Sequence, residues 1–124
     1  MPARESAVRI VVLAHDLLGT YGDLGNGLVL AARLRWRGQP AELVVHEGGT
    51  AVPAAGDIYL LGGGEDAPQF TALHALRTSG ALNQAADAGS VVLAVCAGFQ
   101  LIGTSLVDAD GGSLPGLGLV DAIT

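Results

Sequence analysis

Residues 90–103 read SVVLAVCAGFQLIG, in which an apolar run rich in valine passes directly into a segment of helical character. An uninterrupted apolar run of this length is typical of a strand that is covered on both faces. A strand that leads at once into a helix indicates a sheet of the α/β class. We therefore predict a strand over residues 90–95 and a helix that follows Cys96.

Three runs upstream of this stretch have the same strand-like composition, and they cover residues 8–14, 41–45 and 57–61. Helical segments are predicted between the strands, at residues 26–36 after a glycine-rich loop (19–25), and at residues 68–77 and 81–88. This alternation predicts an α/β, flavodoxin-like fold, in which helices flank a mostly parallel sheet. The loops at the carboxyl ends of the strands are then expected to form the ligand site.

The alternation of strands and helices gives way to a different pattern after Gly103. Residues 108–112 predict a hairpin turn, and residues 116–122 predict one further strand. A strand with little sequence behind it would leave an open sheet edge. We therefore expect residues 1–124 to form a single, partial domain that lacks its carboxyl-terminal side.

Composition excludes several classes of function. The chain has a net charge of -6, six arginines and no lysine, which disfavours nucleic acid as a partner and rules out chemistry that needs a lysine. The single cysteine cannot form an internal disulfide, which suits the cytosol. The amino terminus has no signal-peptide layout, and no apolar stretch reaches membrane length. We expect a cytoplasmic protein without membrane insertion.

Cys96 is the main candidate for covalent chemistry. A nucleophile elbow needs a strand that turns sharply into a helix, with small residues beside the nucleophile. Ala94, Ala97 and Gly98 meet that requirement. The first turn of a helix also offers unpaired N–H groups that favour a thiolate. The alternative is a buried, unreactive thiol at an ordinary strand-to-helix junction.

Residues 62–64, here called the glycine triplet, follow the strand at 57–61. The triplet formally opens a dinucleotide fingerprint, but Glu65, Asp66 and Pro68 stand where a phosphate would need an open helix start. Backbone N–H groups of Gly63 and Gly64 could instead stabilise an oxyanion together with the N–H of Ala97. A tight turn that requires glycine is the alternative.

Other polar residues carry weaker signals. Asp23 and Asn26 precede the first long helix, where capping is the simpler interpretation, although Asp23 lies on the same rim as Cys96 and could face a partner. The three histidines, His15, His46 and His74, stand in no motif that marks a base for Cys96. No cysteine or histidine cluster has metal-ligand spacing, so neither a metal site nor a cofactor is expected.

Several stretches together resemble the glutaminase subunit of lipid II isoglutaminyl synthase (GatD-like), a class I-type glutamine amidotransferase of the cobyric acid synthase-like group. The matching stretches are YGDLGN (21–26), DIYLLGGGED (57–66) with Gln69, VCAGFQLIG (95–103) and LGLVD (117–121). They run over essentially the whole chain. The cysteine stretch indicates the amidotransferase class, and its combination with residues 21–26 points to the isoglutaminyl synthase subunit.

The resemblance implies that Cys96 attacks the side-chain amide of L-glutamine and releases ammonia. It also implies that Gly63, Gly64, Ala97 and Gln100 bind the substrate or its oxyanion. Ammonia would pass to a MurT-like, ATP-dependent ligase that amidates the D-glutamate of lipid II in peptidoglycan synthesis. The resemblance places the activating histidine and a substrate-binding arginine beyond residue 124, so the chain alone is expected to be inactive.

The sequence departs from the usual elbow motif at one position, and two alternative functions remain open. Ala94 replaces the first glycine of the usual elbow, a small change that the turn should tolerate. A cobyric acid synthase-type domain is the alternative pathway. A DJ-1-like or flavodoxin-like module with a redox-active or inert Cys96 is the alternative without enzymatic activity.

Overall fold

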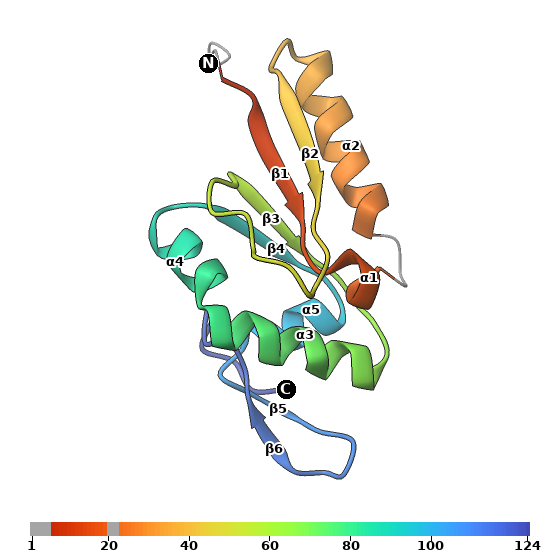
Figure 1. The fold of residues 1–124 in the computed structure, drawn as a ribbon, viewed down its shortest axis with the longest axis vertical. Coiled ribbons are helices and arrows are strands. Elements are labelled where there is room, and N and C mark those ends of the chain that lie inside the picture. The colour runs from red at the N-terminus through yellow and green to blue at the C-terminus, as the bar shows by residue number, and fades with distance from the viewer. Residues whose placement is uncertain (1–5, 20–22) are drawn as a thin grey trace.

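The sheet at the centre of the molecule has four parallel strands in the order β2-β1-β3-β4 (Figure 1). The computed structural model describes residues 6–19 and 23–124. The strands are β1 (Val8–Val12), β2 (Ala41–Val45), β3 (Ile58–Leu61) and β4 (Val91–Ala94). Because all four strands are parallel, their carboxyl ends meet along one rim of the sheet.

Helices lie on both faces of this sheet (Figure 1). They are α1 (His15–Leu18), α2 (Asp23–Trp36), α3 (Asp66–Ser79), α4 (Ala81–Asp87) and α5 (Ala97–Ile102). A separate antiparallel hairpin follows, made of β5 (Ser105–Val107) and β6 (Ser113–Pro115). The predicted α/β fold with a mostly parallel sheet flanked by helices is confirmed.

The core is divided by the sheet into two layers. On one face, Ile10, Val12 and Leu60 pack with Ala31 of α2. On the other face, strand residues pack with buried residues of the remaining helices: Val11, Leu13, Tyr59, Leu61, Leu73, Leu76, Leu82 and Leu101. Alternate residues of β1 and β3 therefore enter opposite layers, which explains why β3 and the buried residues 10–12 of β1 are apolar without interruption.

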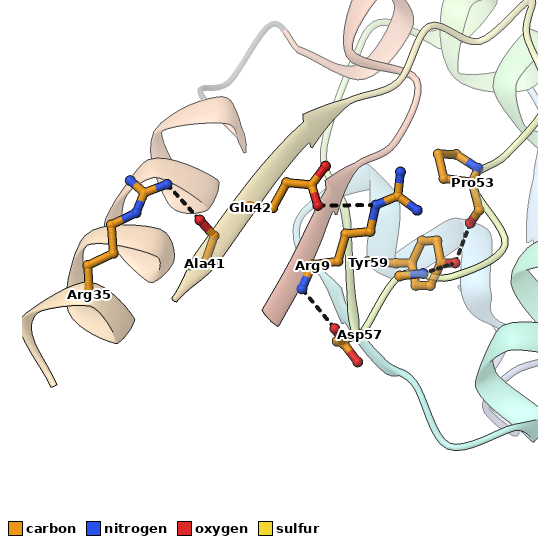
Figure 2. Close-up of polar contacts among 8 residues, drawn as sticks. Arg9, Arg35, Ala41, Glu42, Pro53, Asp57 and Tyr59 are labelled. Atoms are coloured by element: carbon orange, nitrogen blue, oxygen red, sulfur yellow. Dashed lines mark hydrogen bonds and ion pairs between the residues drawn. The ribbon is translucent and has the colours of Figure 1, made fainter. Parts of the chain in front are cut away.

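Polar contacts join the strands at the amino end of the sheet (Figure 2). The backbone N–H of Arg9 donates to Asp57 Oδ2 at 2.8 Å, and Arg9 Nε lies 3.9 Å from Glu42 Oε2. Arg35 at the end of α2 donates to the carbonyl of Ala41 at 2.8 Å. The hydroxyl of Tyr59 donates to the carbonyl of Pro53. These contacts tie β1, β2 and β3 together where they begin.

The prediction of a strand over residues 116–122 is wrong, because this segment does not pair as a strand. Only Ile123, just beyond it, forms an isolated bridge with Ser105. Its N–H groups are used to cap α5 instead. Leu117 donates to the carbonyl of Leu101 at 2.8 Å, and Leu119 donates to that of Ile102 at 2.8 Å. The last carbonyls of a helix need partners, and this loop supplies them.

Among the described residues, apolar side chains are exposed at several places, including the edge of the sheet and the end of α2. Strand β4 ends the sheet, and Val91, Leu93 and Val95 are exposed along it. Trp36, the last residue of α2, is 81% exposed. Among the described helices, none combines the length and hydropathy that a membrane crossing needs.

Candidate active site

Cys96 occupies a strained backbone position between β4 and α5. Its φ of 57° and ψ of -123° lie in a region that residues with a side chain rarely adopt. The N–H of Val95 still pairs with Leu61 of β3 at 2.9 Å, whereas the carbonyl of Cys96 already accepts the N–H of Phe99 at 3.0 Å. The chain thus changes from extended to helical at this one residue, and its thiol is exposed.

Gly98 brings the start of α5 against the loop that follows β3. A Cβ atom placed on Gly98 would lie 2.1 Å from the carbonyl oxygen of Leu61 and 2.9 Å from that of Gly62. Only glycine permits this approach, since both neighbouring atoms belong to the backbone. The structure therefore places Cys96 and Ala97 beside the glycine triplet, as the sequence predicted for the carboxyl rim.

Asp23 reaches the same loop from α2. The sequence pattern predicts a helix cap or a partner-facing charge, but only 5% of the surface of Asp23 is exposed. The side chain of Asn26 and the backbone of Gly63 lie close enough to its carboxylate to favour the charged form. Burial, the largest influence, raises the pKa of Asp23 above its ordinary value despite these contacts. Tyr21 and Gly22, which belong to the same motif, lie outside the described residues.

Gln100 lies one turn after Cys96 on α5 and is exposed. Its Oε1 accepts a hydrogen bond of 3.4 Å from Nε2 of Gln69, which α3 contributes and which is almost fully buried. Gln69 connects the helix after the glycine triplet with the helix after Cys96. In the sequence, Gln69 belongs only to the stretches that carry the resemblance, and no periodicity marks it as part of this cluster.

The histidines have different environments, and none is hydrogen-bonded to Cys96 within residues 6–19 and 23–124. His46 is buried, with Nδ1 accepting the N–H of Ala14 at 3.0 Å and Nε2 lying 3.0 Å from the carbonyl of Thr50. These two contacts leave His46 in a structural role. His15 is close enough to interact electrostatically with Asp23, and His74 is exposed on α3.

A strained cysteine beside a glycine-rich loop at the carboxyl rim is an arrangement suited to acyl transfer. Residues 9–124 match the model of the CobB/CobQ-like glutamine amidotransferase domain. The chain belongs to this family. In the part of this amidotransferase domain that the structure describes, no three acidic, histidine or cysteine side chains gather where a metal ion could bind.

Relatives of the domain include GatD subunits and cobyric acid synthases. It is 32% identical over 111 residues to the lipid II isoglutaminyl synthase (glutamine-hydrolyzing) subunit GatD of Staphylococcus aureus. The match covers 88% of this chain and 46% of the relative. It is 35% identical over 121 residues to the cobyric acid synthase of an Acidovorax species, covering 94% of this chain and 22% of the relative. The chain thus spans less than half the length of each of these relatives.

The family and GatD-like relationship predicted from the sequence is confirmed by these matches. The matching family is one of glutamine amidotransferase domains, and the Staphylococcus aureus relative is named as glutamine-hydrolyzing. The roles of Cys96, the glycine triplet, Ala97 and Gln100 remain predictions for this chain.

Proposed function

We propose that this domain hydrolyses L-glutamine with Cys96 as the nucleophile. Sγ attacks the side-chain amide carbon, the C–N bond breaks, and the nitrogen takes a proton and leaves as ammonia. Water then adds to the thioester, the Sγ–C bond breaks, and glutamate departs while the thiol is restored. The observation that supports this most is the positive φ of Cys96, which presents an exposed thiol beside the glycine triplet.

The glycine triplet and α5 are proposed to stabilise the oxyanion formed in the first step. The N–H of Ala97 starts α5 and needs no helical partner, so it is available to a substrate. Backbone donors of the triplet would complete the oxyanion site. Gln100, one turn further along α5, is proposed to contact the glutamine substrate, with its side chain held by Gln69.

The proposed recipient of ammonia is a MurT-like, ATP-dependent ligase that amidates D-glutamate of lipid II in the cytoplasm. The GatD relatives and the resemblance of residues 21–26 to that subunit support this assignment. We further propose that residues 1–124 are one partial domain whose glutaminase activity is low when it is alone. The absence of a hydrogen bond between Cys96 and any described histidine supports this, since an unassisted thiol cleaves amides poorly.

Covalent labelling with 6-diazo-5-oxo-norleucine tests the nucleophile. This glutamine analogue carries a diazo ketone, and the thiol displaces N2 to form a thioether after the diazo carbon takes a proton. We expect mass spectrometry to find the adduct on Cys96, with protection by excess L-glutamine and no adduct in Cys96→Ala. Alkylation of Cys96 by iodoacetamide without any labelling by the analogue would contradict the proposal.

Glutamate release by the purified 124-residue chain tests the proposal that its glutaminase activity is low when it is alone. We expect little release. Rapid release that Cys96→Ala abolishes would show that the chain already holds a complete catalytic apparatus.

Amidation of a corrinoid is a second candidate, supported by the cobyric acid synthase matches over most of the chain. Ammonia transfer assayed with a lipid II ligase subunit and, separately, with a corrinoid-amidating ligase distinguishes the two pathways. We expect transfer in the first assay. Transfer only in the second would establish the corrinoid pathway.

A further inference from the structure

Asp23 is a carboxylate buried against a backbone loop. It is the first residue of α2, and its side chain fills the space above Gly62. A Cβ atom placed on Gly62 would lie 1.0 Å from Asp23 Oδ2 and 1.8 Å from its Cγ. While Asp23 keeps this position, Gly62 has to be glycine, because the carboxylate of Asp23 occupies the place of any side chain there.

The same carboxylate also interacts with the backbone N–H of Gly63. Asn26 and His15 interact favourably with it as well, yet Oδ2 is buried with no hydrogen-bond partner among the described residues. Burying a carboxylate with one unsatisfied oxygen costs free energy. A residue that served only to cap α2 could do so from a solvated position.

We propose that Asp23 is a positioning residue for the glycine triplet. Its contact over Gly62 and its interaction with the backbone of Gly63 fix the first peptide groups of the triplet beside Cys96. Because the carboxylate interacts with the N–H of Gly63, the N–H of Gly64 remains to stabilise the oxyanion together with that of Ala97. This inference rests on the proposed glutamine hydrolysis and assigns Gly63 to the architecture of the loop.

The triplet needs such support because three successive glycines have no side chains to hold their conformation. Gly98 holds the loop from the side of α5, through its contact with the carbonyls of Leu61 and Gly62. Asp23 holds it from the side of α2. Oxyanion stabilisation depends on donors that are already in place before the reaction, so both contacts bear on the rate of attack by Cys96.

Two reagents with different requirements test this role in the protein as the cell makes it, purified with any subunit that remains bound. The diazo glutamine analogue needs the substrate site, whereas iodoacetamide needs only an accessible thiol. In Asp23→Ala, we expect the rate of labelling by the analogue to fall about tenfold or more, with iodoacetamide alkylation changed by less than about twofold. Asp23→Asn keeps an acceptor for Gly63 and the same shape, so it should retain most of the rate.

Three results of the labelling would overturn the proposal. Faster labelling of Asp23→Ala would mean that the carboxylate blocks the N–H of Gly63 from the substrate. An unchanged rate would mean that Asp23 has no part in positioning. An equal loss with both reagents would mean that the substitution alters the thiol itself.

A double-substitution cycle tests the contact without relying on catalysis. Gly62→Ala should lower the thermal midpoint by several degrees in the wild-type background, because the new methyl group expels the Asp23 carboxylate. In the Asp23→Ala background, Gly62→Ala should lower the thermal midpoint much less. Equal decreases in the two backgrounds would disprove the contact between Asp23 and Gly62. If the wild type reacts only with iodoacetamide, the proposed hydrolysis fails, and this cycle still decides whether Asp23 holds the triplet.

Discussion

The two ends of the central sheet are built in different ways. At the amino end, the strands are joined by partly exposed polar contacts around Arg9 (Figure 2). At the carboxyl end, the described residues include two non-glycine positions with positive φ, Ala14 and Cys96, and a buried carboxylate at Asp23. The amino end thus holds the strands in register at low cost, whereas the carboxyl end maintains strain and close backbone approaches that place a reactive group. Substitutions should therefore have larger effects at the carboxyl end.

Gly98→Ala should produce the largest loss of stability. Its Cβ atom would meet two backbone carbonyls, so α5 would have to move away from β3 at a cost of about 3 kcal/mol or more. Urea denaturation followed by circular dichroism measures the change. Gly25→Ala is the matched control, because Gly25 is also helical but its Cβ atom would meet none of the described residues within 4 Å. The control should gain about 0.5–1 kcal/mol, and similar losses in both variants would contradict the close approach.

The strain at Cys96 should appear as a difference between two substitutions. Both Cys96→Gly and Cys96→Ala remove the thiol, but only glycine adopts a φ of 57° without strain. We expect Cys96→Gly to be more stable than Cys96→Ala by about 1–2 kcal/mol in the same urea titration. Equal stabilities would show that this backbone position is relaxed.

Asp23 should make stability depend on pH. Burial raises its folded pKa above 3.8, so between these two values the folded state binds more protons than the unfolded state. Stability contributed at this site is therefore lost as pH rises through that window. Comparing the wild type with Asp23→Asn isolates this site from other titrating groups, including the neighbouring His15. As pH rises, the free energy of unfolding of the variant should increase relative to that of the wild type and then level off. A difference in unfolding free energy that stays constant with pH would refute the raised pKa of Asp23.

Glu42→Gln should have the smallest effect. The ion pair between Glu42 and Arg9 is long, at 3.9 Å, and its side chains are 56% and 33% exposed. Removing it should change stability by less than about 0.5 kcal/mol. A loss as large as that of Gly98→Ala would mean that the amino end is as constrained as the carboxyl end.

The four parallel strands could be predicted because their runs are short, predominantly apolar and rich in β-branched residues or leucine. The elbow at Cys96 could be predicted because small residues surround it at a strand-to-helix junction. Helix α1 has only four residues, too few to show a helical period. The segment over residues 116–122 has a strand-like pattern, but the carbonyls of α5 capture its N–H groups.

The burial of Asp23 over Gly62 could not be predicted from the sequence, because it joins two segments that are far apart along the chain. The pattern around Asp23 indicates only the start of a helix. Similarly, the pairing of Gln69 with Gln100 depends on how α3 and α5 are placed by the sheet. Local patterns thus predicted the strand-to-helix turn at Cys96, while the contacts around that turn depend on tertiary packing.

The exposure of Trp36 determines how these experiments are best monitored. Trp36 is the only tryptophan in the chain, and its indole is already in water in the native protein. Its emission spectrum should therefore be nearly the same before and after unfolding, and it would make a folded sample look denatured. The same exposure makes it a sensitive fluorescent reporter of any macromolecule that covers the end of α2.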